Sequence, residues 1–268
     1  MSAMHAISPL DSRYSKSTQT VANYFSEFAF YKSRVEVEVD YYLRLLQQLH
    51  PELPYRSDLV QMCVHFTEQD YARIKTIESE TRHDVKAIEL FVREKFLQAQ
   101  VPFCELIHFG LTSQDVNSVG LSKNLHTFVK REYVYLLKEL MQALSALSDR
   151  SKYPCLSFTH GQPAVPTLLS KELDVFWMRL DRQFFQLSRS TLSAKFGGAV
   201  GGLNAHVFCY PEHNWEEFCD SFVSKYGLER NTYTTQIDSY DSYAEVFQNI
   251  MRINNICLDL AQDVWLYC

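Results

Sequence analysis

Apolar residues recur every three or four positions along most of the chain, which is the spacing of helices that bury one face. The longest uninterrupted run is 114–150, a stretch with one glycine and no proline. At ~1.5 Å per residue a helix of this length extends about 55 Å, whereas the average helix has only ~11–12 residues. It therefore suits the core of a helical bundle or a seam between subunits better than a compact monomer. Its apolar stripe consists of Leu121, Leu125, Val129, Tyr133, Leu136, Leu140, Leu144 and Leu147.

The same spacing predicts further helices on both sides of this one. A capping box at 67–70 opens one of them, and a second capping box, which starts at Ser242, opens the last. Gly227 is expected to follow the C-cap of a shorter helix. The last helix is still in progress at Cys268, so we expect the chain to stop inside it. The predicted helices are 27–49, 67–80, 84–99, 167–192, 215–226 and 242–268, with 1–18 and 153–166 irregular.

The composition agrees with long helices. The 268 residues include 8 glycines and 8 prolines, so residues that interrupt helices are scarce. Hydrophobic residues make up 46% and charged residues 22%, as in an ordinary globular protein. Shorter helices precede longer ones, which predicts an N-terminal helical domain over 1–111 and a central long-helix bundle over 112–268. The predicted fold class is all-α.

The net charge and the spacing of the cysteines exclude some classes of function. Lys and Arg total 26 and Asp and Glu total 32, a net charge of −6 that argues against general attraction to nucleic acid or an anionic membrane. An anionic small substrate would need cations placed locally. The seven cysteines form no CxxC pair, which indicates a reducing compartment without disulfides or a zinc site. No signal peptide and no apolar run of ~18 residues is found, so we expect a cytoplasmic protein.

Polar residues that could carry chemistry gather in the loops between the predicted helices. Each loop also has a purely structural interpretation: a histidine at a helix start commonly acts as a cap, and Thr112–Ser113 is a good N-cap for the long helix. Lys195 lies beside four glycines, but the GxxxxGK[ST] pattern of a P-loop is absent. The loops are 79–84, 108–117, 159–164, 195–201 with Asn204 and His206, and 233–237.

Taken in this order, the sequences of these loops resemble those of the fumarase/aspartase superfamily and, within it, of the adenylosuccinate lyase family. The resemblance extends from Ser8-Pro-Leu-Asp-Ser-Arg-Tyr14 to Asp263-Val-Trp265. Thr-His-Gly-Gln-Pro-Ala at 159–164 and Thr-Ser-x-Asp-x-Asn at 112–117 are similar to the first two signature regions of the superfamily. The opening motif and Arg-Ile-Lys-Thr-Ile-Glu ahead of His83 favour this family among its relatives.

The resemblance implies a cofactor-free C–N lyase in the cytoplasm. Such an enzyme eliminates fumarate from adenylosuccinate, which gives AMP, and from the succinylated aminoimidazole carboxamide ribotide of purine biosynthesis. A base removes the proton β to the leaving nitrogen, and an acid protonates that nitrogen. No metal ion is required. The resemblance also implies a homotetramer in which long helices of four subunits form one bundle and each site draws loops from three subunits.

Catalytic roles follow from the resemblance residue by residue. His160 is expected to protonate the leaving nitrogen, since an imidazole has a pKa that is easily tuned. His83 and Asp84 are expected to contact the substrate and to orient His160 or couple to its charge. Arg82 stands where close relatives often carry Asn, and it places a further charge beside His83.

Binding roles follow in the same way. Arg13 and Tyr14 are expected to hold the nucleotide, with Arg13 as a cation for its phosphate. Thr112 and Ser113 are expected to bind a carboxylate at the N-terminus of the long helix, and Gln236 to bind the dicarboxylate part. The resemblance makes Lys195 and its glycines a structural feature near the site. His108 and His206 are assigned to structure.

The sequence departs from the family in ways that matter for activity. The third signature, a Ser-Ser-x-Met-Pro-x-Lys-x-Asn loop that supplies the serine base, is absent, as are the last bundle helix and the C-terminal domain. We expect them after Cys268, so that the 268 residues form an N-terminal portion with little or no lyase activity of its own. Ser12 and the pair Gly202–Leu203 are smaller departures.

Two other interpretations remain open at this point. The whole protein could be another lyase of the superfamily, such as an argininosuccinate lyase or a fumarase, because all of them share the elimination chemistry. Alternatively, the chain could be an inactive helical fragment or scaffold that lacks the catalytic serine loop.

Overall fold

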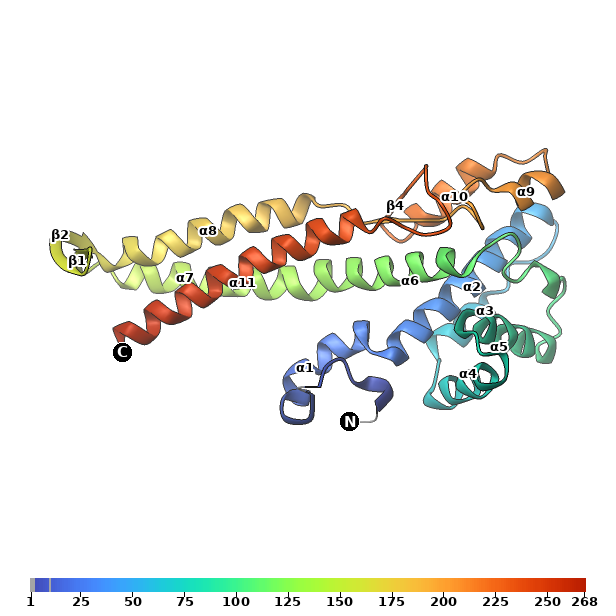
Figure 1. Ribbon diagram of the computed structural model, residues 1–268, viewed down its shortest axis with the longest axis horizontal. Coiled ribbons are helices and arrows are strands. Elements are labelled where there is room, and N and C mark those ends of the chain that lie inside the picture. The colour runs from blue at the N-terminus through green and yellow to red at the C-terminus, as the bar shows by residue number, and fades with distance from the viewer. Residues whose placement is uncertain (1–2, 10) are drawn as a thin grey trace. The chain divides into compact units, whose positions relative to one another are not determined.

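The structure is a computed structural model that describes residues 3–9 and 11–268 (Figure 1). Its residues divide into two compact units, each built from two segments of the chain. The first unit comprises Met1–Phe128 and Leu192–Ser239. The second comprises Val129–Thr191 and Tyr240–Cys268.

The first unit is organised around α2 (Glu27–Leu49), against which α1, α3, α5 and α6 pack. Ser26 caps α2, because its Oγ accepts a hydrogen bond from the backbone N–H of Ala29 at 3.2 Å. The helix is buried over most of its length and forms the core of the unit. The predicted helix 27–49 is confirmed. The other elements of the unit are η1 (Ala3–His5), α1 (Asp11–Phe25), α3 (Ser57–Val64), α4 (Glu68–Thr81), α5 (Asp84–Gln98), η2 (Cys104–Leu106), α6 (Ser113–Phe128), β3 (Ser193–Ala194), α9 (Asn204–Cys209), α10 (Trp215–Ser224) and β4 (Glu229–Arg230).

The second unit contains three long helices and a hairpin. Helices α7 (Val134–Arg150) and α8 (Leu169–Arg189) are antiparallel and are joined by the antiparallel strands β1 (Pro154–Thr159) and β2 (Gln162–Leu168). Helix α8 packs against both α7 and α11 (Asp241–Tyr267), and the three helices lie side by side in Figure 1. Arg252 of α11 donates a hydrogen bond to Gln183 of α8, and Arg179 of α8 forms an ion pair with Asp259 of α11. These two helices are therefore also antiparallel.

The all-α fold class is confirmed: the residues that the structure describes are mostly helical, with two sheets of two strands each. Within the described ranges, no helix is both long enough and apolar enough to cross a lipid bilayer. The predicted division into 1–111 and 112–268 differs from the division into these two units, because α6 packs on α2 and because 192–239 belongs to the first unit. That domain division remains a prediction.

The long predicted helix is present as α6, a π-helical turn η3 (Val129–Tyr133) and α7, which follow one another without a break. A π turn holds one residue more than an α turn, so it changes which side chains face inward. The expected stripe continued through Leu136, Leu140 and Leu147, and all three are exposed. Leu144 of the expected stripe is buried, and Leu137 and Met141 are buried in place of Leu136 and Leu140.

Two predicted boundaries are wrong for local reasons. Residues from Asp11 onward are helical rather than irregular, because the Asp11 carboxylate accepts hydrogen bonds from the backbone N–H groups of Ile7 (2.5 Å) and Ser8 (3.2 Å) and closes the turn ahead of α1. Ser242 is not an N-cap. Helix α11 begins at Asp241, after Tyr240 takes a left-handed backbone conformation with φ 59°, so Ser242 already lies inside the helix.

A buried ion pair ties the N-terminus of α6 to the glycine-rich loop. The carboxylate of Asp115 lies 2.7 Å from Nζ of Lys195, and both side chains are fully buried. The same carboxylate accepts hydrogen bonds from the backbone N–H groups of Gly197 (2.8 Å), Gly198 (3.2 Å) and Thr112 (2.7 Å). The loop and the residues just before α6 are therefore held by one acidic side chain.

We expect the variant Asp115→Asn to lower the free energy of unfolding by about 3–5 kcal/mol, because it leaves the Lys195 ammonium group buried without its counter-charge. Urea denaturation followed by circular dichroism measures the change. The double variant Asp115→Asn/Lys195→Met is the control and should recover part of the loss, since neither charge then remains. A single variant as stable as the wild type would contradict this interpretation.

Candidate active site

The N-terminus of α5 places His83 at the surface of the first unit. Helix α4 ends at Thr81, its C-cap Arg82 has a left-handed φ of 53°, and α5 begins at Asp84. His83 lies between them as the N-cap of α5, and its Nδ1 accepts a hydrogen bond from the backbone N–H of Lys86 at 3.1 Å. Its side chain is 52% exposed. The imidazole thus caps a helix and still faces solvent.

The N-terminus of α6 lies next to this imidazole. The Oγ of Ser113 is 3.4 Å from Nε2 of His83, and Thr112 directly precedes the helix. Two helix N-termini therefore meet at one place, and the dipole of each favours an anion there. The structure brings together four of the residues expected at the site, namely His83, Asp84, Thr112 and Ser113.

Asp84 is paired with a buried cation. Its Oδ2 accepts a hydrogen bond from Nη1 of Arg34 at 2.6 Å. Arg34 is only 1% exposed, and its Nη1 is also 3.4 Å from Oδ1 of Asn117. Partial burial raises the pKa of Asp84, but the hydrogen bond and the charge of Arg34 outweigh it, so the pKa lies below its ordinary value. Asp84 is therefore ionised at neutral pH.

Arg34 was not among the residues expected at the site, and Asn117 was expected only as part of the 112–117 motif. A signal for Arg34 exists: it lies on the apolar face of α2, next to Val35 and one turn before Glu38, where a charge needs a partner. Asn117 is the last residue of the Thr-Ser-x-Asp-x-Asn motif, one turn after Ser113 on α6. Which partner each residue finds depends on contacts between helices that are distant in the sequence.

Arg82 is one departure from the family pattern. It takes a left-handed backbone conformation that Asn and Gly occupy more readily than arginine does. The Arg82 side chain is exposed beside His83. Ser12, a second departure, lies at the start of α1, where its side chain is outside the described part of the structure.

The residues expected to hold the rest of the substrate lie on other elements. Arg13 and Tyr14 are exposed on α1, with the Arg13 guanidinium 5.5 Å from the centre of the Tyr14 ring. Gln236 is exposed in the irregular segment between β4 and α11. His160 lies in the second unit, whereas the other site residues lie in the first.

The segment that contains Gln236 is anchored to the interior of the first unit. Asp238 is buried and accepts hydrogen bonds from Ser118 Oγ (2.6 Å) and from the backbone N–H of Lys195 (3.1 Å). Gly201 has φ +78°, and a Cβ atom there would lie 2.3 Å from the carbonyl oxygen of Thr234. This close approach needs glycine. A cavity of about 660 Å³ lies between the glycine-rich loop and this segment.

His160 is at the tip of the β1–β2 hairpin. Thr159 pairs with Gln162, so His160 and Gly161 form a two-residue turn, and their φ values of 52° and 71° are those of a type I′ turn. Glycine is favoured at the second position for this reason. The imidazole of His160 is exposed. A short hairpin of this kind presents a side chain at a defined place and leaves it accessible.

His108 and His206 are internal hydrogen-bonding groups. Nδ1 of His108 is 2.5 Å from Oε1 of the buried Glu38. Burial lowers the pKa of His108, but the charge and hydrogen bond of Glu38 outweigh it, and the pKa is raised. Nε2 of His206 is 2.7 Å from the hydroxyl of Tyr41, and burial lowers the pKa of His206 to about 4. His206 is therefore neutral at neutral pH.

Comparison with solved structures shows the fold. A fumarate lyase from Mesorhizobium sp. BNC1 matches with a TM-score of 0.71 at 18% identity, over 92% of this chain and 56% of that one. The beta-carboxy-cis,cis-muconate cycloisomerase of Acinetobacter calcoaceticus sp. ADP1 matches with a TM-score of 0.72 at 17% identity, over 92% of this chain and 57% of that one.

Comparison with known sequences shows the family. Adenylosuccinate lyases of Legionella pneumophila (strain Corby) and Dictyostelium discoideum are each 40% identical, over 100% and 98% of this chain and 60% and 59% of their own lengths. That of Escherichia coli (strain K12) is 38% identical, over 100% of this chain and 60% of its own length. The chain thus spans about 60% of these relatives. The lyase family model matches residues 16–268. Over that range, the chain belongs to the lyase family.

Proposed function

We propose that the whole protein is an adenylosuccinate lyase. It would eliminate fumarate from adenylosuccinate and from the succinylated aminoimidazole carboxamide ribotide, without a cofactor or a metal ion. The observation that carries the proposal is an identity of 34–40% over the entire chain with several proteins named adenylosuccinate lyase. The meeting of two helix N-termini at His83 and Ser113 supports it, because the substrate carries carboxylate and phosphate groups.

In this proposal His160 is the acid that protonates the leaving nitrogen. An exposed imidazole at a hairpin tip is accessible to a substrate, and histidine exchanges protons near neutral pH. His83 and Asp84 would contact the substrate, with Arg82 as a neighbouring charge. The base would be the serine of the third signature loop, which these 268 residues do not contain.

The residues that we propose to bind the substrate lie in the first unit. Thr112 and Ser113 would hold a carboxylate at the start of α6, and Gln236 would bind the dicarboxylate part. Arg13 and Tyr14, exposed on α1, would hold the nucleotide, with Arg13 at its phosphate. We also place the protein in the cytoplasm, where a nucleotide substrate of purine biosynthesis is available.

Incubation of the full-length protein with a panel of substrates tests the function. We expect fumarate release from adenylosuccinate and from the ribotide, and none from argininosuccinate. Turnover of argininosuccinate without turnover of adenylosuccinate would assign the protein to the argininosuccinate lyases of the superfamily. Turnover of neither would favour a helical scaffold without this activity.

We expect the variant His160→Ala of the full-length protein to lower kcat by about 10²–10⁴-fold, the usual contribution of a general acid. The helical circular dichroism spectrum should stay unchanged, since the side chain is exposed in a turn. His65→Ala, a change of another exposed histidine, is the matched control. A near-normal kcat in His160→Ala would remove this residue from the acid role.

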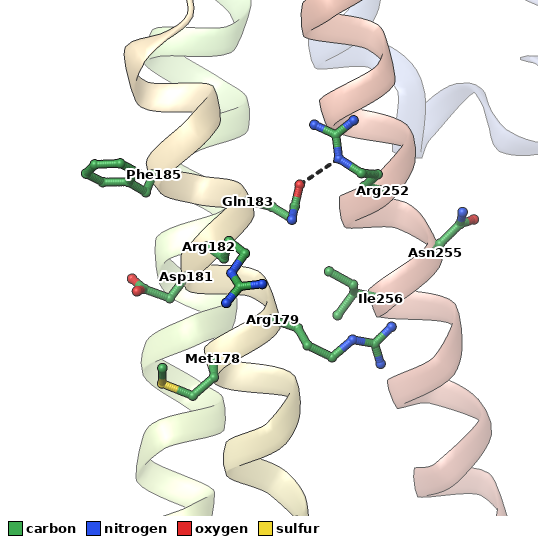
Figure 2. Close-up of a pocket in the computed structure, with 9 residues that line it drawn as sticks. All are labelled: Met178, Arg179, Asp181, Arg182, Gln183, Phe185, Arg252, Asn255 and Ile256. Carbon is green, nitrogen blue, oxygen red and sulfur yellow. Dashed lines mark hydrogen bonds between the residues drawn. The ribbon is translucent and has the colours of Figure 1, made fainter.

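We also propose that the full-length protein is a homotetramer whose sites are shared between subunits. Support comes from the second unit, which leaves large apolar side chains exposed on all three long helices. A groove of about 680 Å³ between α8 and α11 adds to this surface (Figure 2). Met178 and Ile256 lie in it beside Arg179, Arg182 and Arg252. The exposed apolar residues of the three helices include Leu136, Leu140, Leu147, Val175, Met178, Phe185, Phe247, Met251 and Leu258.

Sedimentation of the full-length protein checks the assembly. We expect the mass of four chains at micromolar concentration, and Leu136→Glu should shift the distribution toward smaller species because it puts a charge into an apolar contact. Lys138→Glu, on the same helix, is the control for added negative charge. A clean monomer for the wild type would contradict the proposal.

A further inference from the structure

The carboxylate of Asp84 has two side-chain neighbours that compete for it. Its Oδ2 lies 2.6 Å from Nη1 of Arg34, which is a short charge-assisted hydrogen bond. Its Oδ1 lies 3.7 Å from Nδ1 of His83, which is beyond hydrogen-bond distance. Arg34 therefore holds the carboxylate, and His83, although adjacent in sequence, does not bond to it.

Arg34 is itself held in one orientation. Its guanidinium lies 4.0 Å from the centre of the Phe30 ring and 4.3 Å from that of Tyr31, and Nη1 also approaches Asn117. A planar guanidinium stacked on aromatic rings presents its N–H groups in fixed directions. With only 1% of the residue exposed, water does not compete for these groups. The position of Asp84 is thus set from the interior of the unit.

The hydrogen bond from the backbone N–H of Lys86 decides which nitrogen of His83 carries the proton. Because Nδ1 accepts a hydrogen bond from the backbone N–H of Lys86, it must present its lone pair. In the neutral imidazole the proton is then on Nε2, the nitrogen 3.4 Å from Ser113 Oγ. His83 therefore offers an N–H donor on the side where the two helix N-termini meet.

A free carboxylate at position 84 would reverse this arrangement. Carboxylates readily accept the Nδ1–H of an adjacent imidazole and so place the proton on that nitrogen. Nε2 would then present a lone pair, which repels an anion, and the cap of α5 would be lost. We propose that Arg34 is a positioning residue of the site: by holding Asp84 away from His83, it keeps the His83 imidazole on the Lys86 N–H and its Nε2–H directed at the substrate.

The consequence for activity rests on the proposed function. Adenylosuccinate is an anion, and an N–H donor at His83 would attract it where a lone pair would not. Arg34 does not touch the substrate in this proposal. It acts through Asp84 and His83, so its loss should alter the tautomer of one imidazole as well as the rate.

The test uses the full-length protein and the variants Arg34→Gln and Arg34→Lys. Arg230→Gln is the matched control, because Arg230 is a nearly buried arginine of the first unit that pairs with a half-exposed aspartate, Asp220, at 2.5 Å. We expect Arg34→Gln to lower kcat/KM about tenfold or more, Arg34→Lys to retain more activity because it keeps the charge near Asp84, and Arg230→Gln to stay within about twofold. An effect no larger than that of the control would overturn the proposal.

A second measurement reads the tautomer directly and needs no turnover. In protein labelled with ¹⁵N-histidine, solid-state NMR distinguishes Nε2–H from Nδ1–H, and the His83 signals are identified by their loss in His83→Gln. We expect Nε2–H in the wild type and in Arg34→Lys, and Nδ1–H in Arg34→Gln. A wild-type His83 that carries its proton on Nδ1 overturns the proposal, even where Arg34→Gln does not fold.

These two readouts separate the inference from the function on which it rests. If the wild type turns over no adenylosuccinate, the proposed function fails, whereas the tautomer and its dependence on Arg34 can still be measured. If the wild type is active and His83 carries its proton on Nε2 both in the wild type and in Arg34→Gln, the proposed function stands and the role of Arg34 fails.

Discussion

One buried carboxylate determines how the start of α6 and the glycine-rich loop of the first unit are assembled. Asp115 balances the charge of Lys195 and at the same time accepts the backbone N–H groups that precede α6 and that open the glycine-rich loop. A fully buried ion pair is tolerated only when nearly all of its hydrogen-bonding capacity is used. Lys195 also donates to the carbonyl oxygen of Gly198 at 2.5 Å. The start of α6, and with it Ser113, is therefore fixed by electrostatics as well as by the packing of α6 on α2.

The candidate site is built from groups that the fold already needs. His83 caps α5, and Ser113 begins α6, so both side chains of the candidate site lie at helix N-termini. These positions combine a rigid backbone with a surface location. Arg34 on α2 connects α5 and α6 through its contacts with Asp84 and Asn117. A buried arginine of α2 thus links the core of the unit to its polar surface.

Much of this architecture could be predicted from sequence, and the failures have physical causes. The helix 27–49 and the capping box at Thr67 depend on local spacing, and both are confirmed. The proximity of His83 and Ser113 could be expected only through a resemblance, because no local pattern brings residues 30 positions apart together. Arg34 was missed because its partner lies 50 residues away. The start of α11 was misplaced because the left-handed backbone of Tyr240, not the polar side chain of Ser242, precedes the helix.

The π-helical turn between α6 and α7 gives the long helix two separate apolar rows. One extra residue rotates the helix face by about 100° relative to an unbroken α-helix. Leu137 and Met141 consequently face α8, and Leu136 and Leu140 remain outside. Regular α-helical winding of the same residues would turn Leu136 and Leu140 toward the face that Leu137 and Met141 now occupy. The winding of that turn, more than the identity of any leucine, decides which hydrophobic surface the second unit buries and which one it leaves exposed.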